Sequence, residues 1–439
     1  MHNAQTSFRN RGGSSMKAGQ LAKIVIPIIL LASHILSCDV GTMDLSDDWG
    51  TEYVYPHSSG PTDLIVYNDL LFFGSRSGNQ AFLFSYDGIS SPRYYPTESW
   101  DCLSGLAPWK LLVWNDALYF LGMKNPSTLG LWKYDGFDDP AFIESMSQAG
   151  SAGVYPDGSI IYNNKMYFTN YGIMRSLWCY DGSNEPGLIF DPDPEYAHGV
   201  SLRIIFNNKL FFNAYTAEGA GILWSYDETD GCKLAPGINP VEGNLLGAMI
   251  VFKDKLFYSA DDGNFGREPW IYDGSNPPEL VMDINTGSSG SGICGLTVLN
   301  DTLFFIADDG IHGFELWKYD GINAPSMVSD IHPGDSCEFQ RYQRRHMLPF
   351  NNKLYFAADD GVRGIELWVY DGAAAPHMVA DINTNGDSSP DYFVEYNGKL
   401  YFSAYTDENG RELWVYDGTH APTLAADLYP GTYTETTFW

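Results

Sequence analysis

Apolar and polar residues alternate over short stretches along most of the chain, and each stretch ends at Gly, Asn or Asp. The clearest example lies near the C-terminus. There Lys-Leu-Tyr-Phe-Ser-Ala (399–404) precedes a turn through residues 408–410, and Glu-Leu-Trp-Val-Tyr-Asp-Gly-Thr (412–419) follows it. Alternation with a period of two on both sides of a glycine-containing turn is typical of half-buried strands joined as a hairpin.

The same text recurs through the chain with a regular period. Each copy carries a Tyr-Asp pair with an aromatic residue two positions before the Tyr, and successive copies lie 46 to 51 residues apart. The pairs end at Asp87, Asp135, Asp181, Asp227, Asp273, Asp320, Asp371 and Asp417. A period in the forties is typical of a propeller blade or of a helical repeat. Short segments rich in Tyr, Phe, Trp, Val and Ile favour strands. The sequence therefore predicts an all-β fold, a β-propeller of four-stranded blades, with eight blades and seven as the alternative.

The last copy shows the expected order of strands within a blade. Residues 392–396 form the innermost strand, residues 399–404 the second, residues 413–416 the third and residues 423–428 the outermost. Asn397-Gly398 is a strong signal for a tight hairpin turn between the first two. Because strands alternate in direction, the turns fall on two faces. We call the face with the Asn-containing and Tyr-Asp-Gly turns the hairpin face. The face with the Asp-Asp-Gly turns and the loops after the fourth strand is the loop face.

The signature itself resembles a known family. Residues 412–419 match the E-L-W-x-x-D-G-T motif of the bacterial repeat proteins named after it, and residues 315–321 and 366–372 match all but the Thr. Residues 268–274 have Pro in place of Leu, and the first four copies depart further, with Phe84 for Trp and Glu228 after Asp227. The chain is also similar to kelch-type propellers, without their glycine pair. The resemblance covers residues 61 to 430 and implies a secreted or surface-attached propeller.

The first 38 residues are typical of an export signal. Lys17 and Lys23 flank the start of an apolar run at residues 24–35, which ends in Ile-Leu-Ser-Cys at Cys38. A basic start, an apolar core and small residues before a cleavage point predict a secretory signal. The final four residues resemble the bacterial lipobox, in which the Cys is lipidated. The alternative, a transmembrane anchor, would need about 20 apolar residues.

These patterns predict three regions and a location. Residues 1–38 are a lipoprotein signal peptide, with Met1 or Met16 as the start. Residues 39–60 are a flexible tether. Within it, residues 53–56 resemble the fourth strand of a repeat, as residues 427–430 do. One of these two segments is expected to complete the outer edge of the blade where the ring closes. Residues 61–439 are the propeller. The expected place is the bacterial cell envelope, with the lipid as the sole contact to the membrane.

The charge balance narrows the range of partners. Four of the 25 basic residues lie within the signal, which leaves 21 against 55 acidic residues and a net charge of −34. Such a field repels nucleic acid and anionic lipid headgroups, and it favours cations, basic proteins or uncharged sugars. We therefore expect a monomer that binds a protein or a glycan and no nucleic acid. The other explanation of the charge is solubility outside the cell.

Five cysteines follow Cys38, so at least one is unpaired. Cys294 and Cys337 fall in loops of adjacent repeats, and a disulfide between them is one alternative to free thiols.

Several carboxylates per blade are expected to converge on the loop face. Asp-Asp-Gly turns recur in repeats five to seven, and the Glu that opens the third strand and the Asp that ends the fourth recur in the last four repeats. Calcium takes six to eight oxygen ligands of this kind. The alternative is that Asp satisfies turn amides and Glu anchors the neighbouring loop. The candidate calcium ligands are Asp261, Asp262, Glu268, Asp283, Asp308, Asp309, Glu315, Asp330, Asp359, Asp360, Glu366, Asp381, Glu412 and Asp427.

One insertion breaks the period between the sixth and seventh repeats. It holds the densest basic cluster of this acidic chain, Arg341, Arg344, Arg345 and His346, with Asp335 nearby. Functional groups tend to lie on loops held by a rigid scaffold. The insertion is a candidate binding site for an anionic group, and charge balance with surrounding Asp residues is the other explanation.

Two functions follow from this pattern. The first is a lipid-anchored binding propeller that meets a protein or glycan through its loop face. The second is a propeller glycan hydrolase or lyase that uses a carboxylate pair with Tyr or His346. A catalytic site usually combines unlike residues from several blades, whereas these acids repeat identically. We assign no catalytic residue and favour the binding module.

Overall fold

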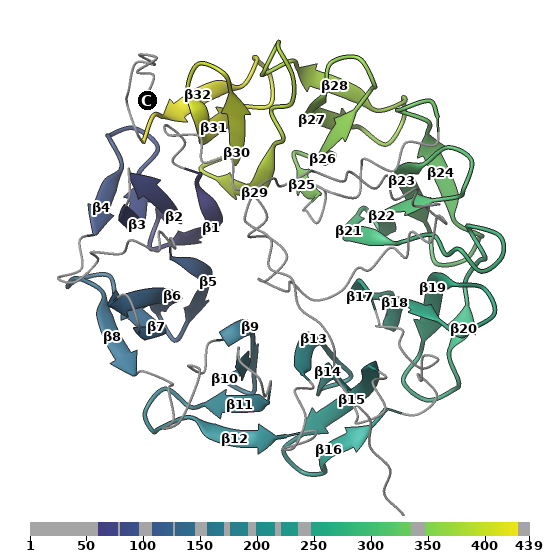
Figure 1. The fold of residues 1–439 in the computed structure, drawn as a ribbon, viewed down its shortest axis with the longest axis horizontal. Coiled ribbons are helices and arrows are strands. Elements are labelled where there is room, and N and C mark those ends of the chain that lie inside the picture. The colour runs from purple at the N-terminus through teal and green to yellow at the C-terminus, as the bar shows by residue number, and fades with distance from the viewer. Residues whose placement is uncertain are drawn as a thin grey trace, which may run out of the picture. The chain divides into compact units, whose positions relative to one another are not determined.

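The alternating segments form strands in the computed structural model. It describes residues 60–77, 80–95, 108–125, 128–144, 156–170, 176–191, 199–215, 221–235, 247–334 and 347–428. The chain divides into two units, Met1–Asp39 and Val40–Trp439, and all described residues belong to the second. They form eight antiparallel four-stranded sheets arranged as a β-propeller (Figure 1). This confirms the all-β propeller and the count of eight blades.

Each blade takes four consecutive strands in order from the centre outward. The innermost strands are β1 (Thr62–Tyr67), β5 (Trp109–Trp114), β9 (Pro156–Tyr162), β13 (Val200–Phe206), β17 (Met249–Phe252), β21 (Cys294–Leu299), β25 (Leu348–Phe350) and β29 (Asp391–Tyr396). The second strands are β2 (Leu70–Ser77), β6 (Ala117–Asn125), β10 (Lys165–Asn170), β14 (Lys209–Tyr215), β18 (Lys255–Asp261), β22 (Thr302–Asp308), β26 (Lys353–Asp359) and β30 (Lys399–Thr406).

The third strands are β3 (Gln80–Tyr86), β7 (Thr128–Tyr134), β11 (Leu177–Tyr180), β15 (Gly221–Asp227), β19 (Arg267–Tyr272), β23 (Phe314–Tyr319), β27 (Ile365–Tyr370) and β31 (Gly410–Tyr416). The outermost strands are β4 (Arg93–Tyr95), β8 (Ala141–Glu144), β12 (Gly187–Phe190), β16 (Gly231–Leu234), β20 (Glu279–Leu280), β24 (Ser326–Ser329), β28 (His377–Ala380) and β32 (Thr423–Ala426). The described ranges contain no helix, and hence none with the length and apolar character that crossing a membrane requires.

The turns between the first two strands share one conformation in all eight blades. Both central residues have positive φ, as at Asn397 (50°) and Gly398 (68°). Such turns match the right-handed twist of the strands, and Asn, Asp and Gly tolerate this conformation best. The prediction from Asn397-Gly398 is confirmed, and it extends to the Asn-Asp and Asn-Asn pairs of six other blades and to Lys253-Asp254 of the fifth.

The ring closes where the last blade lies against the first. β29 contacts β1, and the Tyr396 hydroxyl donates a hydrogen bond to the carbonyl of Asp69 at 2.7 Å. Leu71, Phe73 and Leu413 share one buried cluster across this junction. Both blades already have four strands from one continuous stretch of chain, so the closure is side-by-side packing. Residues 53–56, the candidate closing strand, lie outside the described residues.

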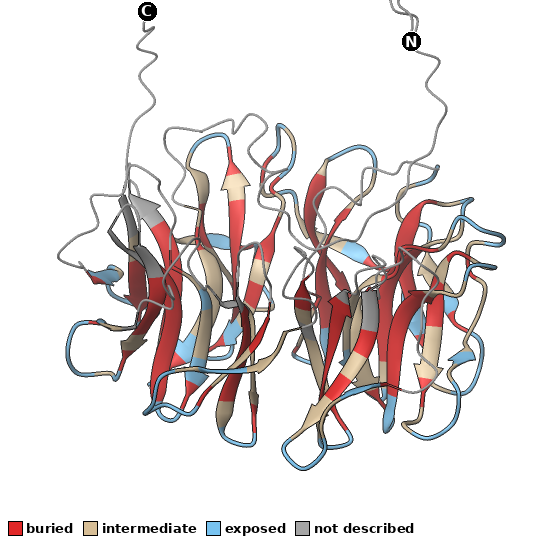
Figure 2. Ribbon diagram, turned by 60° about the horizontal axis from the view of Figure 1, so that its bottom comes forward, coloured by how far each residue is buried: buried red, intermediate tan, exposed pale blue. Residues whose placement is uncertain are grey.

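Aromatic side chains fill the space between blades. Trp317 of the sixth blade is buried in one cluster with Phe252 and Phe257 of the fifth. The indole N–H of Trp317 donates to the carbonyl of Ala307 at 3.1 Å, which satisfies its one polar group. Figure 2 shows the result, with buried residues along the strands and exposed residues at the turns. The signature tryptophans all lie in or pack against such clusters, with Trp132, Trp317 and Trp368 buried and Trp178, Trp224, Trp270 and Trp414 half-buried.

Candidate functional site

The signature glutamates of the third strand are buried and hold the loops that follow the fourth strand. Glu366 is fully buried and accepts hydrogen bonds from the amides of Ile382 (2.9 Å), Asn383 (3.3 Å) and Ser388 (3.1 Å). The Ser388 hydroxyl donates to the same carboxylate at 2.6 Å. One side chain thus fixes both ends of a loop that connects two blades.

The neighbouring blades repeat this arrangement. Glu268 accepts from the amides of Ile284 (3.1 Å) and Asn285 (3.0 Å) and from the Ser291 hydroxyl (2.7 Å). Glu315 accepts from the amides of Ile331 (3.0 Å) and His332 (2.9 Å). Glu412 accepts from the amide of Leu428 at 2.9 Å. We call each such carboxylate and the loop it holds a glutamate clasp.

The Asp-Asp-Gly turns bond their own backbone. In the sixth blade Asp308 accepts from the amide of Gly310 at 2.7 Å, and Asp309 accepts from the amides of Ile311 and His312 at 2.9 and 2.8 Å. The same pattern occurs at Asp261 and Asp262 and at Asp359 and Asp360. These carboxylates serve the turn geometry that the sequence offered as the alternative to metal binding.

The aspartates at the ends of the fourth strands are more exposed than the clasp glutamates, and, beyond the effect of burial, the charges of Asp283 and Asp330 help to raise the pKa of Glu268 and Glu315. Asp330, Asp381 and Asp427 are exposed, and Asp283 is half-buried. Within the described part of the chain, no three His, Cys, Asp or Glu side chains are grouped so that they could hold a metal ion. The calcium hypothesis stays a prediction, while the observed partners of the Glu and turn Asp oxygens are amides and hydroxyls.

Burial changes the acidity of the clasps. Removal from water raises the pKa of Glu268 and of Glu315 to about 7, against the opposing effect of their hydrogen bonds, and it raises the pKa of Glu366. A folded-state pKa above the unfolded value favours the protonated form in the folded state. The stability that this contributes is present below the unfolded pKa and is lost as pH rises through the folded pKa.

We therefore expect the thermal unfolding midpoint to be higher at pH 5 than at pH 8. The turn aspartates have pKa values below their ordinary value, so their contribution is lost only in more acidic solution. Midpoints measured across this window, in high salt to screen the general repulsion of an acidic chain, check the effect. A Glu268→Gln variant should flatten the profile, and His312→Asn controls for the raised pKa of that histidine. An unchanged slope in Glu268→Gln would contradict the assignment.

Two of the sequence candidates cannot be placed. Arg341, Arg344, Arg345 and His346, together with Asp335, lie outside the described residues, and so does Cys38. Among the described cysteines, no disulfide joins Cys179, Cys232 and Cys294. Burial raises the pKa of Cys232 to about 11 and that of Cys294 to about 12, which disfavours their thiolates. Cys337, the other half of the suggested disulfide, also lies outside the described residues.

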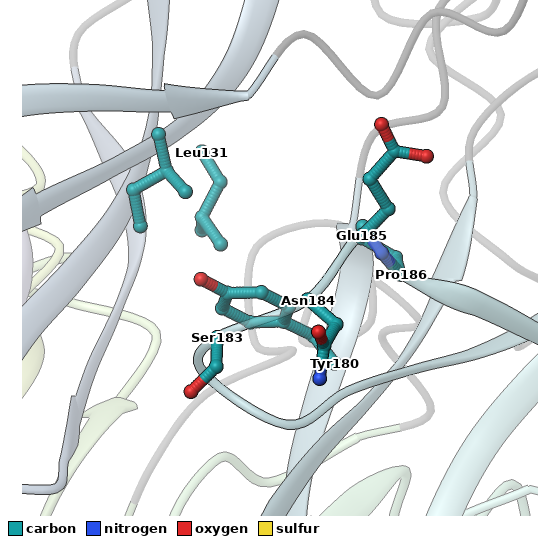
Figure 3. A pocket seen from close by; sticks show the side chains of 7 residues that line it. Leu131, Tyr180, Ser183, Asn184, Glu185 and Pro186 are labelled. Atoms are coloured by element: carbon teal, nitrogen blue, oxygen red, sulfur yellow. The ribbon is translucent and has the colours of Figure 1, made fainter.

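A small pocket lies between the second and third blades at the hairpin face. It has a volume of about 160 Å³ and is lined by Leu131, Ile143, Tyr180 and the turn at residues 183–186. The Tyr180 side chain points toward Leu131 (Figure 3). The amide group of Asn184 on the rim donates to Asp181 at 2.7 Å, so the turn is held in place. The pocket is large enough for one apolar side chain and too small for an extended ligand.

The hairpin face carries residues that sequence reasoning missed. The Asp of each Tyr-Asp pair accepts two amides of its own turn, as Asp135 does from Phe137 (3.0 Å) and Asp138 (3.4 Å). The Asp of each pair therefore caps its turn. It also places the residue two positions after the Asp at the tip of the turn, where Ile89 and Phe137 are 90% exposed. These exposed apolar residues could have been found from the sequence, because the Tyr-Asp pairs align the eight tip residues with one another.

Comparison with known proteins adds little beyond the fold. No protein-family model matches the chain, and no curated protein matches it. Solved structures similar to it include the β-propeller domain of the Trilobed protease from Pyrococcus furiosus. The two chains are 12% identical in sequence, the aligned region covers 85% of this chain and 99% of the other, and the TM-score is 0.42.

A puromycin-hydrolyzing peptidase of Mycobacterium tuberculosis is similar at 10% identity over 87% of this chain and 55% of the other, with a TM-score of 0.48. A prolyl endopeptidase is similar at 10% identity over 84% of this chain and 50% of the other, with a TM-score of 0.47. The chain spans about half the length of these two peptidases. None of these likenesses identifies an activity of this chain.

Proposed function

We propose that the protein is a binding module, a propeller held at the cell envelope by a lipid on Cys38 that presents its turns and loops to a protein or glycan. The observation that carries this proposal is that repeated side chains bond the framework, through the Asp of the Tyr-Asp pair in all eight blades and through the clasp Glu in the last four. The repeated Glu and Asp side chains hold the framework, as Glu366 and Asp308 do, while the turn tips differ from blade to blade. A constant framework with variable tips suits recognition.

A ligand screen tests the binding role. The full-length protein is applied to a glycan array and to a panel of basic proteins, each with and without calcium. Saturable binding to one class supports the proposal, and a requirement for calcium would also support the predicted metal site. Turnover of a polysaccharide that disappears in Asp335→Ala or His346→Ala would instead establish the enzymatic alternative.

The anchor makes a separate prediction. In a bacterial host, the protein should incorporate labelled palmitate and partition into the detergent phase, and Cys38→Ala should abolish both because no acyl acceptor remains. Cys102→Ala is the matched control and should leave both unchanged. A mature chain that begins at any residue other than Cys38, as read by mass spectrometry, would refute the lipid anchor.

A further inference from the structure

Large apolar side chains that reach solvent are concentrated on the first two blades. Of the eleven such side chains among the described residues, five belong to these blades. Ile89 and Phe137 are each 90% exposed, Tyr94 is 55% exposed, and Val66 and Val113 are 38% and 37% exposed. All five lie in, or beside, the turns of the hairpin face. We call these five residues the blade 1–2 patch.

Each turn of the patch is held in place, and the turn of Ile89 lies against the eighth blade, where a Cβ atom at Gly88 would lie 3.3 Å from the Tyr401 hydroxyl oxygen. The Asp87 carboxylate accepts the amides of Ile89 and Ser90 at 2.8 and 2.6 Å, so Ile89 is held at its tip. The Tyr67 hydroxyl of the first blade donates to the carbonyl of Asp116 in the second at 2.7 Å.

The turn that carries Phe137 also lies against the first blade. A Cβ atom at Gly136 would lie 2.6 Å from the amide nitrogen of the Asn68 side chain. The exposed apolar groups are therefore presented by a preorganised surface, which lowers the entropic cost of binding.

The charge around the patch is unusual even for this chain. In blades 3, 4, 5 and 7 a lysine opens the second strand and lowers the pKa of the turn aspartate in the same blade. These lysines are Lys165, Lys209, Lys255 and Lys353. The first two blades have Leu70 and Ala117 at that position.

The turns that surround the patch carry six carboxylates, Asp69, Asp87, Asp116, Asp135, Asp138 and Asp139. Two cations lie close to them. Arg93 is 3.9 Å from Asp139 in a solvent-exposed pair, and Lys133 contributes to the lowered pKa of Asp135. An excess of negative charge therefore remains around apolar side chains that nothing in the described residues covers.

We propose that the blade 1–2 patch binds a polypeptide segment in which lysine or arginine alternates with large apolar residues. Exposed apolar groups rimmed by polar residues mark interaction surfaces. Complementary charge selects the partner and raises its association rate. A membrane is the less favoured occupant, because anionic headgroups repel this surface. The inference deepens the proposed binding function and rests on it.

The first test uses short fluorescent peptides and the full-length protein. A peptide of alternating Lys and Leu should bind, while a Lys-Ser peptide of equal charge and a Glu-Leu peptide should bind at least ~10-fold more weakly, because each lacks one half of the recognition. Higher salt should weaken the Lys-Leu complex. The double variant Ile89→Ser with Phe137→Ser should lose ~10-fold or more in affinity.

Conservative Asp→Asn variants test how much the negative charge contributes to peptide affinity. Asp69→Asn with Asp116→Asn keeps the left-handed turn, since Asn occupies that position in other blades, as Asn164 and Asn208 do. This double variant should lower the affinity ~3-fold to 10-fold and reduce the salt dependence.

Matched controls separate the patch from the general surface. Ile311→Ser with Val362→Ser removes two apolar groups that are 70% and 83% exposed on the loop face. Asp254→Asn with Asp301→Asn changes the same turn position in blades 5 and 6. Both should leave the affinity within about twofold of the parent, as surface substitutions elsewhere generally do.

Three results would overturn the inference. One is equal binding of the Lys-Ser and Lys-Leu peptides. Another is equal losses in the control and patch variants. The third is adsorption to phosphatidylcholine vesicles that depends on Phe137 and takes the place of peptide binding. The patch variants are also run through the screen for the proposed function. A ligand that they still bind with full affinity disproves the role of the patch and leaves the binding module standing.

Discussion

Gly266→Ala is expected to lower the free energy of unfolding by about 2–5 kcal/mol, from left-handed strain together with overpacking. Gly266 has a φ of +68°, and a Cβ atom there would lie 2.6 Å from the backbone nitrogen of Gly290 and 2.7 Å from the carbonyl oxygen of Ser288. Both atoms belong to the loop that the clasp of Glu268 holds, so neither can move without breaking that clasp.

A second glycine of the same conformation gives the control. Gly231 has a φ of +72°, and a Cβ atom there would meet nothing within 4 Å. Gly231→Ala carries the backbone strain without the collision, and it should cost about 1–2 kcal/mol. Urea unfolding of the two variants and the parent checks the difference. Equal losses at both positions would show that the loop yields and that close packing at the clasp has little importance.

Glu366→Ala should reduce the free energy of unfolding by about 3–5 kcal/mol, because it leaves the amides of three residues and the Ser388 hydroxyl without their acceptor in a buried site. Glu315→Ala should cost less, since the two amides of Ile331 and His332 depend on it. The order of the two losses is thus part of the prediction. Urea unfolding monitored by tryptophan fluorescence measures both.

The matched control replaces an exposed glutamate on the same face. Glu408 lies in the turn between β30 and β31 and is exposed, so Glu408→Ala should change the stability by less than about 0.5 kcal/mol. If Glu366→Ala were as mild as Glu408→Ala, the carboxylate would not be what holds the loop. If added calcium stabilised the parent but not Glu366→Ala, that result would favour the metal hypothesis instead.

The regular features of the fold could be predicted because their causes are local. The turn at Asn397-Gly398 has positive φ at both residues, which their side chains permit, and Trp317 is buried because large apolar side chains recur at one face of each strand. The candidate site depended on more distant contacts. Glu366 bonds groups 16 to 22 residues further along the chain, and nothing in a single copy separates a loop anchor from a calcium ligand.

The repeated sequence motif alone was sufficient to predict the class of fold, the length of a blade and the order of its strands. These features depend on the alternation of apolar and polar residues and on turn residues, which act over a few positions. Closure of the ring and the burial of the signature glutamates required the folded chain. Each of these depends on how one blade lies against the next, and contacts between blades join residues that are far apart in the sequence. No short stretch of sequence therefore indicates which residues of two neighbouring blades will lie against each other.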